Sequence, residues 1–261
     1  MKHSIVIPFL DRNKGWTQYL NVCVWAIDRS AKLCGETDYE ILVVDGGSTV
    51  QREKQSPHER LLPMQCDTFN KCFLLNVGVD CAVGGVLTLL DADAIVGPEF
   101  MRNIDTLLSD TELTKLCYRV KYLPPGYNET LFVADRELVV SEAFANYHAF
   151  QRAAEAYGRP HFLKREGGHP VFGNSQFSIR RDVLGDLRWD ESYAGGRMED
   201  VEMNRRIADR YGDRYRAEIV TNPCGAILMT THPQIPHWCS KTQTDANNRR
   251  YMRHYREERQ R

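Results

Sequence analysis

Two kinds of apolar pattern alternate along the first third of the chain. Short apolar runs at 4–8, 39–45 and 86–90 end in turn or polar residues, as buried strands of a parallel sheet do. Between them, 16–27 and 69–83 carry apolar residues at helical spacing. This alternation predicts an α/β fold with a mixed, mainly parallel sheet, helices on both faces, and ligands bound at the carboxyl ends of the strands.

The later part of the chain continues the pattern. Helical spacing is found at 99–108, over a long segment at 135–157, and at 201–211. Apolar runs at 116–122 and 225–229 predict two more strands. The segment 158–170 holds Gly167–Gly168 and two histidines, and both a lid and a plain surface connection fit it.

Composition narrows the class of protein. A chain of 261 residues with 42% hydrophobic and 26% charged residues fits one globular domain. A formal charge of -1 gives no electrostatic reason to expect a nucleic-acid partner. No apolar run approaches the roughly 20 residues of a membrane span, and the first residues lack a signal-peptide layout, so we expect a cytoplasmic protein. Eight cysteines without a CxxC pair predict reduced, mostly buried thiols rather than a zinc site.

The strongest candidate chemistry follows the third predicted strand. Asp91 and Asp93 are two residues apart, so both carboxylates can leave the sheet edge on the same side. Two hard oxygen ligands with open positions suit Mg²⁺ or Mn²⁺ held jointly by protein and a diphosphate. The alternative is a turn that caps a helix.

A second acidic pair opens a predicted helix. Glu199–Asp200 follows Gly195–Gly196, where the backbone can bend closely around a ligand. Helix capping alone would account for acidic residues at this position. A carboxylate there could also deprotonate an incoming hydroxyl group.

Further candidates stand at other predicted strand and helix ends. His232 follows the last predicted strand and is better placed than His237 to complete a metal site, and an imidazole ligand favours Mn²⁺. Asp45 could bind a base or ribose, or simply form a turn. Arg12 and Lys71 could offset diphosphate charge, or be solvated surface charges.

Taken in order, these segments resemble the GT-A glycosyltransferases, in particular the family of the β-galactosyltransferases and their bacterial family-2-like relatives. Residues 8–12 are similar to the family's Pro-Phe-x-x-Arg segment, and 69–78 to its Phe-Asn-Arg-x-x-Leu-Leu-Asn-Val-Gly stretch, with Lys71 in place of arginine. Asp91-Ala92-Asp93 matches the metal-binding motif. Residues 171–174 are similar to a Phe-Gly-Gly segment beside the donor, and 193–205 to the Gly-rich stretch, Glu-Asp pair and Asn-Arg that follow.

The resemblance implies roles for individual residues. Asp200 would be the catalytic base and Glu199 an acceptor contact. Asp91, Asp93 and His232 would bind Mn²⁺ or Mg²⁺. Together with the placement of Asp45, it predicts a donor-binding set that comprises Pro8, Phe9, Arg12, Asp45, Phe69, Lys71, Asp91, Gly173 and Asn174.

One departure limits what the resemblance implies. The family's Trp-Gly-Trp-Gly-Gly is here Tyr193-Ala194-Gly195-Gly196-Arg197-Met198, without the aromatic residue that contacts donor and acceptor. The identity of the acceptor therefore cannot be inferred from the family. The donor sugar also stays open, because galactose, glucose and their N-acetyl forms differ at one or two hydroxyl or amide contacts that no motif reports.

The expected function is an inverting, metal-dependent transfer of a hexose or N-acetylhexosamine from a nucleotide-diphosphate sugar, with UDP as first choice, to a hydroxyl of a glycan or glycolipid, as in polysaccharide biosynthesis. A retaining enzyme, a sugar-phosphate nucleotidyltransferase and a non-catalytic carbohydrate-binding module remain alternatives. Within one GT-A domain, residues 1–95 would form the nucleotide-binding half, 96–240 the acceptor and catalytic half, and 241–261 a basic tail. That tail could contact an anionic membrane at its inner face or be a solvated helical end.

Overall fold

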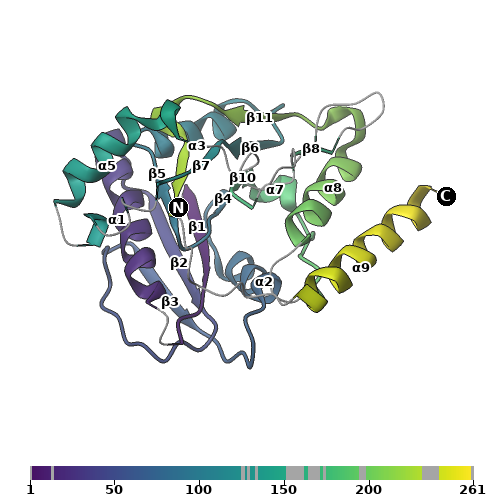
Figure 1. Cartoon of the computed structure of the whole chain (residues 1–261). Helices are drawn as coiled ribbons and strands as arrows, with labels where there is room; N and C mark the ends of the chain where they lie inside the picture. Colours follow the sequence, from purple (N-terminus) through teal and green to yellow (C-terminus); the bar gives the residue numbers. More distant parts are fainter. Residues whose placement is uncertain are drawn as a thin grey trace.

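The computed structural model describes residues 2–12, 15–124, 127, 130–132, 135–150, 162–163, 171–172, 175–193, 198–230 and 241–259. Its centre is a seven-stranded sheet in the order β11-β6-β10-β4-β1-β2-β3 (Figure 1). The strands, in chain order, are β1 (His3–Phe9), β2 (Tyr39–Asp45), β3 (Glu59–Pro63), β4 (Val86–Leu89), β6 (Lys115–Tyr118), β10 (Phe177–Arg180) and β11 (Ala217–Val220).

Most neighbouring strands of this sheet are parallel. β1 pairs in parallel with β2 and β4, β2 with β3, and β6 with β11, whereas β10 runs antiparallel between β4 and β6. The carboxyl ends of β1, β2 and β4 therefore meet at one edge, and β10 starts at that same edge, with Phe177 opposite Leu89. The predicted mixed, mainly parallel sheet is confirmed.

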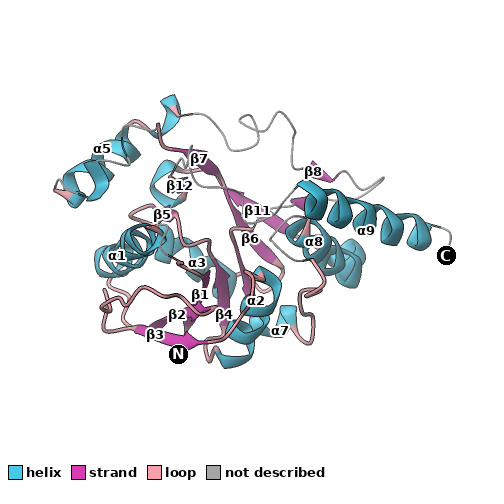
Figure 2. Ribbon diagram, turned by 60° about the horizontal axis from the view of Figure 1, so that its bottom comes forward, coloured by secondary structure: helices cyan, strands magenta, loops and turns pink. Residues whose placement is uncertain are grey.

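Helices cover both faces of the sheet, as the apolar pattern predicted. They are α1 (Trp16–Cys34), α2 (Lys71–Cys81), α3 (Phe100–Ser109), α5 (Arg136–Ala145), α7 (Arg181–Leu184) and α8 (Glu199–Tyr211). Alternate residues of β1 point to opposite faces: Ile5 and Ile7 pack with α1 and α3, whereas Val6 packs with α2. Figure 2 shows α1 and α3 on one side of the strands, and α2, α7 and α8 on the other.

Two smaller sheets and a terminal helix complete the described residues. β5 (Ala94–Val96), β12 (Ile227–Met229) and β7 (Val120–Tyr122) form a three-stranded sheet, and β8 (Phe162–Leu163) pairs with β9 (Val171–Phe172). Helix α9 (Lys241–Arg259) forms the C-terminal basic segment, and its Tyr251 is buried. Among the described residues, no helix is both long and apolar enough to cross a membrane.

Two predicted elements were wrong in extent. The strand predicted at 116–122 is two strands, β6 and β7, because Arg119 bonds to Val220 and then to Ile227, which carries the chain from one sheet to the next. The helix predicted at 135–157 ends at Ala145 and is followed by a 3-10 turn, Tyr147–Ala149. Buried Lys121 donates to the carbonyls of Tyr147 and His148, which fixes this turn; residues 151–157 lie outside the described residues.

The described cysteines are free thiols, but fewer of them are buried than predicted. Of the seven described, Cys23, Cys72 and Cys117 are buried, Cys81 is exposed, and the others are half-buried. Burial raises the pKa of the Cys23 and Cys72 thiols, so both are protonated at neutral pH.

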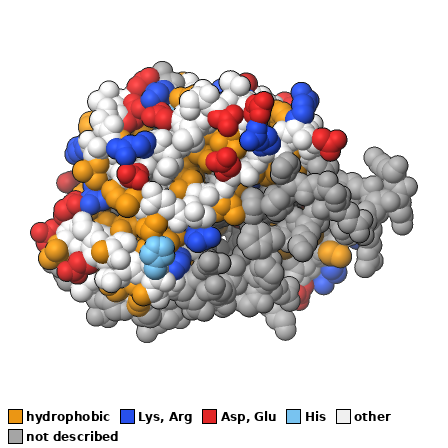
Figure 3. All heavy atoms as spheres, turned by 90° about the horizontal axis from the view of Figure 1, so that it is seen from above, with side chains coloured by type: hydrophobic (Ala, Val, Ile, Leu, Met, Phe, Trp, Pro, Cys, Tyr) orange, Lys and Arg blue, Asp and Glu red, His pale blue; other side chains and the backbone are white. Residues whose placement is uncertain are grey.

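The surface seen from above is mixed in charge. Figure 3 shows acidic and basic side chains interspersed on this face rather than gathered by sign. This mixture agrees with a formal charge of -1.

Candidate active site

Three chain segments bring charged side chains to the carboxyl edge of the sheet. Asp91 follows β4, Lys71 begins α2, and Glu199–Asp200 begin α8. The Lys71 ammonium lies 2.8 Å from Asp91 Oδ1, 3.6 Å from Glu199 Oε1 and 3.7 Å from Asp200 Oδ2. Residues far apart in the sequence thus form one cluster, here called the carboxyl-edge cluster.

Lys71 is the cation of this cluster and is only 8% exposed. Burial alone lowers the pKa of a lysine, but the charges of Asp200, Asp91 and Glu199 outweigh it and hold the Lys71 pKa well above its usual value. Lys71 is therefore a permanent positive charge. The alternative of a solvated surface lysine is excluded by its burial.

Asp91 is held in place from both sides. While Oδ1 binds Lys71, Oδ2 accepts hydrogen bonds from Ser175 Oγ at 2.9 Å and from Gln176 Nε2 at 2.5 Å. The Gln176 amide oxygen accepts in turn from the Asp91 backbone N–H at 3.0 Å. Sequence reasoning missed Ser175 and Gln176, because only the antiparallel course of β10 brings them to this edge.

Glu199 and Asp200 stand at the first turn of α8. Glu199 is 2% exposed and Asp200 is half-buried. Burial first, and then the charge of Asp200, raise the pKa of Glu199 to about 8. Burial and the Asp91 charge raise the pKa of Asp200, although Lys71 partly offsets them. Both carboxyl groups therefore bind a proton more readily than isolated acids do, as closely spaced buried acids are expected to.

The residue before this pair has an unusual backbone. Met198, the N-cap of α8, has φ 71° and ψ -10°, and it is the one described residue other than glycine with positive φ. A left-handed conformation costs a non-glycine residue on the order of 1 kcal/mol. The chain therefore enters the first turn of α8 through a strained residue, which is common next to functional sites.

Asp93 and the end of β12 lie side by side. Met229 pairs with Ala94, and the Thr230 N–H donates to the Asp93 carbonyl at 3.4 Å. The Asp93 side chain is half-buried, and its charge contributes to the raised pKa of Tyr19 after the larger effect of burial. The chain thus leaves β12 beside Asp93, but His232 and His237 lie outside the described residues.

Three further residues of the predicted donor-binding set, Pro8, Phe9 and Asp45, lie at the ends of β1 and β2. Pro8 and Phe9 end β1, and the Phe9 side chain is buried in the core, so only its backbone faces the edge. Asp45 Oδ1 accepts from the N–H groups of Gly47 and Ser48 and from the Ser48 hydroxyl, so Asp45 forms the turn that was the alternative interpretation.

Arg12 and Phe69 flank the same loop region. Arg12 is exposed and donates to the carbonyls of Cys66 and Asp67, so backbone oxygens rather than a described carboxylate hold its guanidinium. Phe69 is half-buried against the core beside α2. Gly173 and Asn174, like the 195–196 glycine pair, lie outside the described residues.

Other residues of the 69–78 stretch have structural roles. Asn70 caps α2 by accepting from the Phe73 N–H at 3.1 Å. Asn76 binds both the carbonyl and the N–H of Trp189, at 3.0 and 2.8 Å. A Cβ on Gly78 would lie 2.2 Å from a Val6 methyl group, so glycine lets α2 approach β1 closely. These contacts place Lys71 at the sheet edge.

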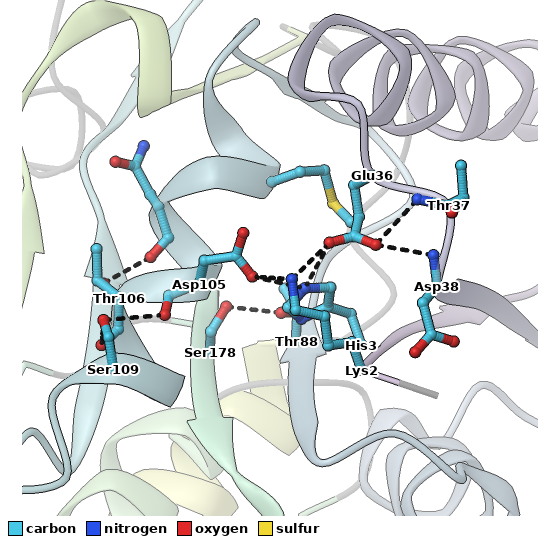
Figure 4. A network of polar contacts seen from close by, with 12 residues as sticks. Lys2, His3, Glu36, Thr37, Asp38, Thr88, Asp105, Thr106, Ser109 and Ser178 are labelled. Atoms are coloured by element: carbon cyan, nitrogen blue, oxygen red, sulfur yellow. Dashed lines mark hydrogen bonds and ion pairs between the residues drawn. The ribbon is translucent and has the colours of Figure 1, made fainter.

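A second polar cluster lies at the opposite edge of the sheet. His3, Glu36 and Asp105 bring potential metal-ligand atoms within 4.8 Å of one another (Figure 4). However, the Lys2 ammonium already lies 2.8 Å from Glu36 Oε2 and 2.7 Å from Asp105 Oδ1. Metal-bound histidines usually donate their other ring nitrogen to a partner, but buried His3 Nδ1 has none among the described residues. We interpret this amino-edge cluster as an ion-pair network.

Comparison with solved structures identifies the fold. S. aureus TarS 1–349 aligns over 88% of this chain and 60% of its own, with 16% identity and a TM-score of 0.55. The same protein in complex with UDP-GlcNAc aligns over 91% of this chain and 60% of its own, with 14% identity and a TM-score of 0.56. The chain thus spans about 60% of that 349-residue fragment and 37% of the longer TarS chain. No protein-family profile and no curated protein matches the sequence.

These structural similarities establish the fold of the chain. The seven-stranded mixed sheet, with its helices on both faces, is the GT-A fold that the sequence resemblance predicted. The carboxyl-edge cluster occupies the position where folds of this layered type bind ligands. No helix, strand or charged group described above conflicts with that class.

Proposed function

We propose that this chain is a nucleotide-sugar-dependent glycosyltransferase whose active site is the carboxyl-edge cluster. The observation that carries the proposal is the meeting of Lys71 with Asp91, Glu199 and Asp200 at the ligand-binding edge of a GT-A fold. Three carboxylates around one ammonium leave negative charge in excess. Such a cluster favours a further cation together with the polar groups of a substrate.

The donor is proposed to be a UDP-linked hexose or N-acetylhexosamine. The UDP-GlcNAc complex of TarS, on the same fold, supports a donor of this type. Arg12 is exposed and Lys71 is permanently charged, so both can bind phosphate oxygens.

A divalent cation fits the acidic residues. Asp91 and Asp93 offer carboxylate oxygens at two half-buried positions, and His232 follows the strand that ends beside Asp93. A carboxylate and imidazole set suits Mn²⁺, with Mg²⁺ as the second choice. When bound, the cation supplies positive charge that stabilises the departing diphosphate.

Asp200 is proposed as the general base and Glu199 as an acceptor contact. Asp200 takes the proton of the acceptor hydroxyl while the hydroxyl oxygen bonds to the anomeric carbon. The bond from that carbon to the phosphate oxygen breaks, and the nucleoside diphosphate leaves with the electron pair. Because its raised pKa of about 8 keeps Glu199 largely protonated at neutral pH, Glu199 can donate a hydrogen bond to the acceptor. Attack opposite the leaving group inverts the anomeric configuration.

The test is a donor screen followed by turnover. Thermal stabilisation by UDP-, GDP- and dTDP-sugars with Mn²⁺ is measured for the wild type, Asp91→Asn and the control Asp105→Asn, whose carboxylate belongs to the amino-edge cluster. We expect stabilisation by UDP-sugars in the wild type and the control, and its loss in Asp91→Asn. Equal responses of all three proteins would contradict this site.

Release of UDP with water as acceptor then measures turnover. Asp200→Asn is expected to lower it by about 10²- to 10⁴-fold without weakening donor binding, because a general base contributes that much. NMR of the released sugar distinguishes inversion from retention.

A further inference from the structure

Lys115 is a second buried lysine beneath the carboxyl-edge cluster. It is fully buried in β6, next to the antiparallel strand β10. Leu116 and Tyr118 pack in the core on the α3 face, whereas Cys117 packs in the core on the α8 face. By strand alternation Lys115 points with Cys117 toward α8.

The Lys115 ammonium bonds to a side chain of α8. It donates to Asn204 Oδ1 and lies 4.4 Å from the centre of the Phe177 ring. Asn204 is fully buried as well, and its Nδ2 donates to the Asp200 carbonyl at 2.6 Å. A continuous path thus runs from the sheet through Asn204 to the backbone of Asp200.

This arrangement is costly as a purely structural contact. The layer around it is apolar, with Met203 and Ile207 of α8 packed into the same core. Burying an ammonium group there opposes folding, and an apolar side chain of similar length is often neutral or stabilising in such a place. A lysine at this position therefore suggests a role other than stability.

We propose that Lys115 is a positioning residue that acts through Asn204 to hold the first turn of α8, so that Glu199 and Asp200 face Lys71 and Asp91. This rests on the proposed function of that cluster. Its positive charge also opposes the other influences that raise the pKa of Asp200. Asn204–Arg205 is the Asn-Arg pair of the family resemblance, but nothing in the sequence connects it with β6.

The experiment compares Lys115→Met, Asn204→Leu and the double variant with Lys121→Met. Lys121 is the matched control, because it is another buried lysine bonded to chain oxygens, those of Tyr147 and His148. In the double variant both polar partners are replaced by apolar groups, so the free energy of unfolding is expected to stay the same or rise.

Turnover is measured as UDP release from a UDP-sugar with Mn²⁺. We expect kcat to fall by about 10- to 100-fold in each single variant and by no more in the double variant, because misplacing a catalytic group costs this much and both residues act as one unit. KM for the donor should change by less than about threefold, since the donor-binding residues are untouched. Lys121→Met should keep its kcat. Wild-type kcat in the folded double variant overturns the proposal.

A second measurement does not depend on activity. Amide hydrogen exchange of residues 203–206, whose N–H groups bond to the first turn of α8, should rise by about tenfold in Lys115→Met and not in Lys121→Met. Unchanged exchange overturns the positioning role. A raised exchange in a protein without UDP release supports the positioning role and counts against the proposed function alone.

Discussion

Each edge of the sheet carries one lysine among carboxylates, but the two clusters differ in their balance. At the amino edge, Lys2 is 39% exposed by its side chain and binds two carboxylates at 2.7 and 2.8 Å. At the carboxyl edge, Lys71 is nearly buried and faces three carboxylates, two of them at 3.6 and 3.7 Å. Lys2 contacts both of its carboxylates closely, whereas Lys71 contacts only Asp91 at such a distance, 2.8 Å.

The pKa values of one glutamate at each edge, Glu36 and Glu199, are shifted in opposite directions. Burial alone would raise the pKa of Glu36, but hydrogen bonds from Lys2 and from the Asp38 backbone lower it to about 2. At the other edge, burial and a neighbouring carboxylate raise the pKa of Glu199 to about 8. Close pairing with a lysine thus lowers the pKa of Glu36, whereas burial beside a second carboxylate raises that of Glu199, as is common at functional sites.

The largest effect on stability is expected when the lysine of each cluster is replaced in turn. Lys71→Met leaves buried carboxylates without their cation and should lower the free energy of unfolding by about 3 kcal/mol at about pH 7.5. Lys2→Met removes a partly solvated partner and should cost about 1 kcal/mol or less. Urea denaturation followed by circular dichroism measures both. Similar losses for the two variants would mean that the clusters do not differ as described.

The next test is the pH dependence of stability. Because the folded-state pKa of Glu199 is raised above its ordinary value of 4.5, the folded protein holds a proton that the unfolded chain releases between pH 4.5 and about 8. The free energy of unfolding should therefore fall as the pH rises through that window, by up to about 1.4 kcal/mol per pH unit. Glu199→Gln should flatten this slope.

Glu36→Gln is the matched variant for the amino edge. The lowered pKa of Glu36 gives a stabilisation that is present above pH 4.5 and is lost as the pH falls toward 2. The substitution should therefore lower the free energy of unfolding by a similar amount throughout the range above pH 4.5, remove the Glu36 contribution to the acid limb, and leave the slope between pH 4.5 and about 8 largely intact. Stability curves that respond alike to both substitutions would contradict the assignment.

The sequence predicted one edge of this molecule better than the other. Asp91, Lys71 and the Glu199–Asp200 pair were identified because each adjoins a strongly periodic element, and in parallel sheets such ends meet at one edge. The hydrogen bonds that hold the Asp91 side chain could not be predicted. Ser175 and Gln176 reach Asp91 only because β10 runs antiparallel beside β4. The amino-edge cluster was missed because Lys2 and His3 precede any recognisable pattern.

The errors in the predicted secondary structure have similar causes. Strands β3, β5, β8, β9, β10 and β11 were not predicted, because the pairing partners that define them lie elsewhere in the chain. The break between β6 and β7 is decided by bonds of Arg119 to residues about a hundred positions away. Local periodicity reports which face is buried, but not which sheet a strand joins.

The smallest expected effect concerns the backbone beside each cluster. Gly35, next to Glu36, has φ 68°, and a Cβ added there would meet nothing within 4 Å, so Gly35→Ala should cost about 1 kcal/mol through conformation alone. Met198, next to Glu199, has φ 71° without being glycine. Because only Gly adopts a positive φ without steric cost, Met198→Gly should be about 1 kcal/mol more stable than Met198→Ala. Thermal denaturation of the three variants measures the differences. If the Met198→Ala and Met198→Gly variants were equally stable, no strain would be stored before α8, whereas the expected order means that the amino edge has relieved its backbone strain with glycine and the carboxyl edge has kept it.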